Sequence, residues 1–168
     1  YAQIDPLRGH IAAIRAYTAN LRGAASHVVA LARDADQYLG EEQTTAKGLA
    51  AYALADAGLA SDDLGAATEA LDQMLAVGER TGQLLLGVTA LCDLAKAGKV
   101  AGRLHEAEML YDRAYRWMAA VNSTGSRLRC AYEFGLADLL REWNRLDEAY
   151  EHAMLGDEIR QKLGGYLV

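Results

Sequence analysis

Side chains that could hold a ligand recur at a spacing of about 40 residues. One column contains Tyr17, Asp56, Lys96 and Asp138. A second column, four residues before the last three of these, contains Tyr52, Cys92 and Phe134. Aromatic faces stack on ligands and charges orient them, so the two columns together suit a polar small molecule or a peptide. These seven residues are the predicted lining of a groove for a ligand or partner.

A purely structural interpretation of the same columns stays open. The charges at Asp56, Lys96 and Asp138 would pair with each other across neighbouring helix hairpins, and the aromatic rings would fill gaps between repeats. Charge pairs on helix surfaces are common and usually contribute little to stability, which favours this second interpretation.

Two stretches of the sequence contain histidine and glutamate at spacings close to those of known metal-binding motifs, but neither motif is complete. The run from His105 to Glu108 contains no second histidine of the zinc-protease motif. Glu148 and His152 are four residues apart, with Glu151 adjacent, but the duplicated motif of a di-iron bundle is missing. The sequence therefore predicts no metal site.

Nucleophilic catalysis has no support either. Ser26 and His27 are neighbours, so their side chains diverge on a helix, and no serine lies in a Gly-x-Ser-x-Gly elbow. Cys92 and Cys130 lie alone inside helical patterns and are predicted to be reduced core or groove thiols. We predict that the chain has no catalytic residues and is not an enzyme.

Composition restricts the partners further. The net charge of −6 argues against nucleic-acid binding, which needs clustered lysine and arginine. No apolar run is long enough to span a membrane and no charged-then-apolar leader is visible, so we expect no membrane contact and a cytoplasmic location. Tyr1 stands where a complete chain would have methionine, so we interpret the sequence as a fragment of a longer protein.

Four recurring turns set the elements that position the two columns. They fall at Gly23, Asp62, Gly102 and Asn144, with steps of 39, 40 and 42 residues, a period typical of stacked helical hairpins. Apolar residues at helical spacing then predict hairpins at about 6–39, 43–81, 84–120 and 126–163. The predicted fold is a single all-α domain over 1–168, a TPR-like α-α superhelix in which the first helix of each hairpin lines the concave groove.

Individual residues support the predicted helix boundaries and predict close packing between the helices of a hairpin. Asp5 is the expected N-cap of the first helix, with Pro6 at its first position, and the residues from Ser61 to Asp63 are expected to cap the fourth helix. Small residues open the second helix of three hairpins, where they would let two helices approach closely: Ala67, Ala107 and Ala149, with Val28 in the divergent first repeat.

Three stretches carry more than generic repeat character. They are Leu7 to Tyr17, Gly102 to Tyr111 and Leu140 to Ala149, and the most specific element is the Glu142-Trp143-Asn144 turn. In this order and spacing they resemble the helical repeat region of the large ATP-dependent LuxR-type transcriptional regulators, the class that includes the maltose regulon activator. Within that turn, Trp143 is expected to staple two hairpins and Asn144 to adopt the left-handed conformation.

The resemblance implies a regulatory or sensor domain of a bacterial transcriptional regulator, with an inducer or a partner protein bound in the concave groove. It also implies an upstream ATP-hydrolysing switch domain and a downstream helix-turn-helix that binds DNA. Neither flanking domain lies within this sequence, so no cofactor is expected here. The alternative is a protein-interaction scaffold with no role in transcription, and self-association through exposed hairpin faces is a further expected contact.

Overall fold

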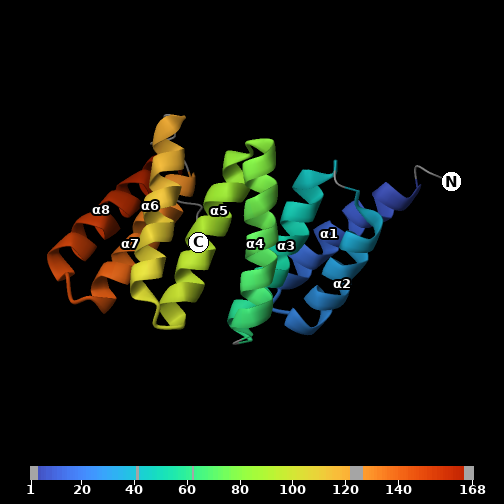
Figure 1. Cartoon of the computed structure of the whole chain (residues 1–168), viewed down its shortest axis with the longest axis horizontal. Coiled ribbons are helices and arrows are strands. Elements are labelled where there is room, and N and C mark those ends of the chain that lie inside the picture. Colours follow the sequence, from blue (N-terminus) through green and yellow to red (C-terminus); the bar gives the residue numbers. More distant parts are fainter. Residues whose placement is uncertain (1–3, 41, 62, 122–126, 165–168) are drawn as a thin grey trace. The chain divides into compact units, whose positions relative to one another are not determined.

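A computed structural model describes residues 4–40, 42–61, 63–121 and 127–164. Within these ranges the chain forms eight helices and no strands, which confirms the all-α fold of TPR-like hairpins (Figure 1). The helices are α1 (Ile4–Leu21), α2 (Ala25–Tyr38), α3 (Thr44–Ala60), α4 (Leu64–Thr81), α5 (Leu84–Val100), α6 (Leu104–Ala120), α7 (Arg127–Glu142) and α8 (Leu146–Lys162).

The helices divide into two compact units, Tyr1–Leu86 and Gly87–Val168. Unit 1 contains α1 to α4, and unit 2 contains most of α5 together with α6 to α8. The single domain over 1–168 stays a prediction.

The same backbone hydrogen bond closes the turn inside each hairpin. An amide donates to the carbonyl five residues earlier, from Ala24 to Ala19 (2.9 Å), Asp63 to Gly58 (2.8 Å), Arg103 to Gly98 (2.8 Å) and Arg145 to Leu140 (3.0 Å). This bond defines the Schellman end of a helix, which places the residue before the donor in the left-handed region. Gly23, Gly102 and Asn144 have φ of 69°, 75° and 56°, whereas the expected turn residue Asp62 lies outside the described residues. The left-handed conformation predicted for Asn144 is confirmed.

The cap at the start of α1 differs from the prediction, whereas that of α4 agrees. α1 already includes Ile4, so Asp5 lies in its first turn rather than at the N-cap. Pro6 is therefore the third residue of α1. It still fits there, because the first four amides of a helix have no hydrogen-bond partner within the helix. At α4, the Asp63 carboxylate accepts from the Ala66 amide at 3.1 Å, as expected of an N-cap.

Alanine-rich cores let the helices of each unit pack closely. In unit 1, α1, α2 and α3 share one core that contains Val28, Ala50 and Ala53. The predicted small positions are buried, with Ala67 and Ala107 fully inaccessible and Ala149 at 9% exposure. A Cβ added at Gly58 would lie 3.0 Å from the Ala67 Cβ, so α3 and α4 approach as closely as the sequence predicts.

Candidate functional site

The first helices of unit 1 bring three predicted site residues to one surface. The half-buried rings of Tyr17 on α1 and Tyr52 on α3 have centroids 6.0 Å apart, with an interplanar angle of 47°. One turn further along both helices, Asn20 Nδ2 donates to Asp56 Oδ2 at 2.7 Å. An aromatic pair therefore adjoins an exposed carboxylate that already has an intramolecular donor.

Unit 2 repeats this polar contact at equivalent positions. Lys99 on α5 lies two repeats after Asn20, and its Nζ donates to Asp138 on α7, which lies two repeats after Asp56. Arg141 also donates to Asp138, at 2.8 Å. In both units an aspartate on one first helix is thus tied to the preceding first helix. We call these two contacts, Asn20–Asp56 and Lys99–Asp138, the first-helix ties.

The other predicted site residues of unit 2 lie in different surroundings. Lys96 pairs with Asp93 of its own helix at 2.7 Å. The Cys92 thiol is buried, and burial raises its pKa from 9.0 to about 12. Phe134 is 40% exposed, and its ring lies 3.1 Å from the place where a Cβ on Gly156 would stand. Phe134 and Asp138, one turn apart on α7, therefore offer surface to a ligand, whereas Cys92 belongs to the core.

A hollow that the sequence did not indicate lies on the second-helix side of unit 1. It has a volume of about 870 Å³ between α2 and α4, with α3 as its floor. None of the seven predicted site residues lines it. Alanines at 50, 51, 66 and 70 are too short to fill the space, and Arg33, Asp36 and Arg80 stand along the walls. Mixed charge over an apolar floor suits a peptide better than a compact anion.

A charged cluster around the buried carboxylate of Glu133 joins α7 to α8 in unit 2. Glu133 is fully inaccessible; its Oε1 forms an ion pair with Arg129, and its Oε2 lies 2.5 Å from Nδ1 of His152. The Arg129 guanidinium lies 4.8 Å from the centroid of Tyr115 and 5.2 Å from that of Tyr132. Sequence reasoning missed this cluster, although the i, i+4 spacing of Arg129 and Glu133 was available as a signal.

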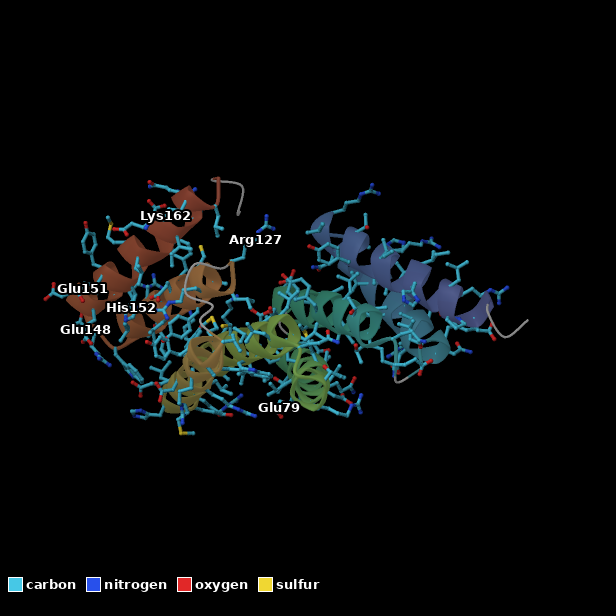
Figure 2. The ribbon with its side chains drawn as sticks, turned by 90° about the horizontal axis from the view of Figure 1, so that it is seen from above. Glu79, Arg127, Glu148, Glu151, His152 and Lys162 are labelled. Atoms are coloured by element: carbon cyan, nitrogen blue, oxygen red, sulfur yellow. The ribbon has the colours of Figure 1, made fainter. Side chains whose placement is uncertain are left out.

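The cluster also explains the incomplete metal pattern on α8. Figure 2 shows Glu148, Glu151 and His152 on the same part of this helix. The His152 ring turns to Glu133 of α7, while Glu148 binds Arg145, which lowers the pKa of the Glu148 carboxyl. Within the part of the chain that the structure describes, no three histidine, cysteine or acidic side chains are grouped to hold a metal ion.

Trp143 and the two cysteines have structural surroundings. The Trp143 ring lies 5.3 Å from that of His105 at the start of α6, so it joins two neighbouring hairpins of unit 2 as expected. Both cysteines are free and buried, and the Cys130 thiol donates to the Gly156 carbonyl at 3.5 Å.

No helix among the described residues is long and apolar enough to cross a membrane.

The family model of the MalT-like TPR region matches residues 9–166. The chain belongs to this family. The match confirms the resemblance drawn from the stretches Leu7 to Tyr17, Gly102 to Tyr111 and Leu140 to Ala149. No curated protein matches the chain.

Proposed function

We propose that this MalT-like TPR region is the regulatory or sensor domain of a bacterial LuxR-type transcriptional regulator, and that its first-helix surface binds an inducer or a partner protein. The family match over residues 9–166 supports the regulatory role. The single structural observation that carries the binding role is the Tyr17–Tyr52 pair beside the exposed Asp56 carboxylate. The proposal includes a cytoplasmic location, an ATP-hydrolysing switch domain upstream and a DNA-binding domain downstream.

Binding at this surface would act through the packing of neighbouring hairpins. A ligand that donates to Oδ2 of Asp56 in the direction now taken by Asn20 competes with the Asn20 amide, which links α1 to α3. The ligand therefore favours whichever arrangement of these helices leaves the carboxylate available. It shifts the equilibrium only by its difference in affinity for the two arrangements.

A thermal-shift screen of sugars, amino acids and short peptides tests the binding role. A ligand at 100 times its dissociation constant stabilises the folded state by about 2.7 kcal/mol, which is readily measured. We expect a hit whose shift is lost in Tyr52→Ala and Asp56→Ala but retained in Met109→Ala, an exposed position on α6. A shift that survives both site substitutions removes this surface from the proposal.

The regulatory role has its own test in the intact gene. We expect it to encode a Gly-Lys-Ser or Gly-Lys-Thr phosphate loop upstream and a helix-turn-helix downstream. A gene with neither refutes the role in transcription.

The second candidate is a protein-interaction scaffold, which the hollow of unit 1 favours. Its walls offer charges of both signs beside the small apolar residues of α3, which suits a peptide that carries charges of both signs. Peptide binding that is lost in Ala51→Trp, a floor substitution, and unaffected by Tyr52→Ala would support the scaffold over the sensor.

A further inference from the structure

The hollow of unit 1 has a filled counterpart in unit 2. Positions in the two units correspond when they are counted from the amide that closes each turn: Ala51 lies twelve residues before Asp63, as Glu133 lies twelve residues before Arg145. In this register, four alanines that line the hollow match large side chains in and beside the cluster around Glu133. Ala32, Ala50, Ala51 and Ala70 correspond to Tyr111, Tyr132, Glu133 and His152.

The four large side chains of unit 2 form a connected group. The ring of Tyr132 packs edge-on against that of Tyr111, with centroids 5.8 Å apart. The carboxylate of Glu133 pairs with Arg129 and with His152. Two aromatic rings, a carboxylate and an imidazole therefore fill the place that is open in unit 1.

Unit 1 retains the cation of this group. Lys47 holds the position of Arg129 in the repeat register, and it lines the hollow. Its side chain is only 21% exposed, whereas the Asp36 carboxylate 3.7 Å from its Nζ is 78% exposed. Four residues further along α3, where unit 2 has the buried Glu133, unit 1 has Ala51. The hollow thus keeps a largely buried ammonium group beside a position from which the carboxylate of unit 2 is missing.

The size and the lining of the hollow suit a small aromatic molecule. Its volume of about 870 Å³ lies in the usual range of small-molecule sites, about 300–1,000 Å³. Met74 of α4 also lines the hollow, and a methionine sulfur makes favourable contacts with aromatic rings. A ring therefore finds alanine and methionine surfaces where rings of the chain itself lie in unit 2.

We propose that the hollow of unit 1 binds a small molecule that carries an aromatic ring and a carboxylate. The ring lies against Ala50, as the side chain of Tyr132 lies in unit 2, and the carboxylate accepts from Nζ of Lys47. An ammonium group has three donors, so Lys47 binds this carboxylate and stays near Asp36. The site shares no residue with the Tyr17–Tyr52 pair or with Asp56, so it stands even if the first-helix surface binds nothing.

Methyl NMR of the 168-residue chain with isotope-labelled methionine tests the site. The probe is 4-hydroxyphenylacetate, which combines the ring of a tyrosine with a carboxylate. Met74 lines the hollow, whereas Met109, Met118 and Met154 lie in unit 2. We expect the probe to shift the Met74 signal alone, with a dissociation constant of about 1 mM or below for so small a ligand. An unchanged Met74 signal up to about 10 mM probe overturns the proposal.

Two matched probes separate the two recognised groups on the parent chain. 4-Hydroxyphenylacetamide keeps the ring but has no charge, and it should bind about tenfold more weakly, because hydrogen bonds between charged groups are the stronger ones. Acetate keeps the charge but has no ring, and it should leave the Met74 signal unchanged at about 10 mM. Equal affinity of acid and amide overturns the role of Lys47, and a shift by acetate overturns the role of the ring.

Two substitutions on α3 test the same contacts from the side of the protein. Lys47→Met should weaken binding of the acid about tenfold and leave the affinity of the amide unchanged, whereas Lys162→Met, at an exposed lysine of unit 2, should bind like the parent. Ala51→Glu places a carboxylate four residues after Lys47, as in unit 2, and should abolish binding of the acid. Helix content from circular dichroism checks that each variant is folded. A folded Lys47→Met or Ala51→Glu variant with parent affinity for the acid overturns the proposal.

A peptide probe separates a free molecule from a protein segment. A short peptide with adjacent tyrosine and glutamate, acetylated and amidated at its ends, carries the same two groups on a backbone. We expect it to shift the Met74 signal no more tightly than 4-hydroxyphenylacetate does. Peptide binding without binding of the free acid overturns the proposal and assigns the hollow to a protein partner.

Discussion

Gly58 and Gly98 hold the same position in two hairpin turns, yet the structure predicts opposite effects when each is replaced by alanine. Both carbonyls accept the amide that closes the turn. A Cβ at Gly98 would have the Ala107 Cβ as its nearest neighbour at 3.7 Å, an ordinary contact. A Cβ at Gly58 would lie 3.0 Å from the Ala67 Cβ and 3.1 Å from both the Ala67 amide nitrogen and the Asp63 carbonyl oxygen.

The magnitudes follow from these distances. Glycine in a helix is roughly 1 kcal/mol less favourable than alanine, so Gly98→Ala should raise the free energy of unfolding by about that amount. At Gly58 the same gain is opposed by overpacking, which typically costs about 1–3 kcal/mol, and two of the crowded atoms belong to backbone that cannot rotate away. We expect a net loss of about 1 kcal/mol for Gly58→Ala.

Differential scanning calorimetry measures both variants against the parent chain. A change of 1 kcal/mol shifts Tm by about 4–8 °C in a unit of 60–100 residues, so the two variants should move in opposite directions. Gly58 lies in unit 1 and Gly98 in unit 2, so separate transitions would each report one substitution. A Gly58→Ala variant that is stabilised as much as Gly98→Ala would refute the close approach of α3 and α4.

Three further predictions concern unit 2. Glu133→Ala leaves the partly buried Arg129 without its carboxylate and should cost about 2–3 kcal/mol in urea unfolding, whereas Glu151→Ala on the exposed surface should change stability by less than about 0.5 kcal/mol. Asn144→Ala should cost about 1 kcal/mol in the same assay and Asn144→Gly should be no less stable than the parent, because φ is 56° there. The pKa of Cys92 is raised from 9.0 to about 12, so the folded state holds the thiol proton more tightly. Its contribution to stability is complete below pH 9 and is lost as the pH rises from 9 toward 12; Cys92→Ala should flatten this part of a stability-against-pH curve, and an unchanged slope would contradict the burial.

The sequence was sufficient for the helical hairpins because their determinants are local. The apolar spacing selects the helices, and a left-handed residue ends the first helix at Gly23, Gly102 and Asn144 whatever packs around it. The prediction of Asp5 as the N-cap of α1 was wrong. A proline is accepted at the first helical position and also two residues further into the helix, so Pro6 does not fix where α1 begins.

The site was less predictable because its contacts join residues far apart in the sequence. The columns placed Lys96 beside the aspartates, but Lys99, one turn later, provides the partner of Asp138. Which turn of a helix meets its neighbour depends on the relative rotation of two packed helices, and spacing along one chain does not report it. The hollow of unit 1 depends in the same way on how far apart α2 and α4 lie above α3.

The first-helix ties bear on whether the surface can respond to a ligand. A ligand that bound only the remaining acceptor positions of Asp56 would leave the surrounding helices unchanged, whereas one that displaces Asn20 from Oδ2 removes a contact between α1 and α3. The exposed hydrogen bond contributes little stability, on the order of 1 kcal/mol, so a ligand of modest affinity can displace it. Tyr17 and Tyr52 stand on the same two helices, so stacking between or beside them also depends on the spacing of α1 and α3. Ligand contacts and hairpin packing thus use the same atoms, which is the coupling that a sensor requires and a rigid scaffold does not.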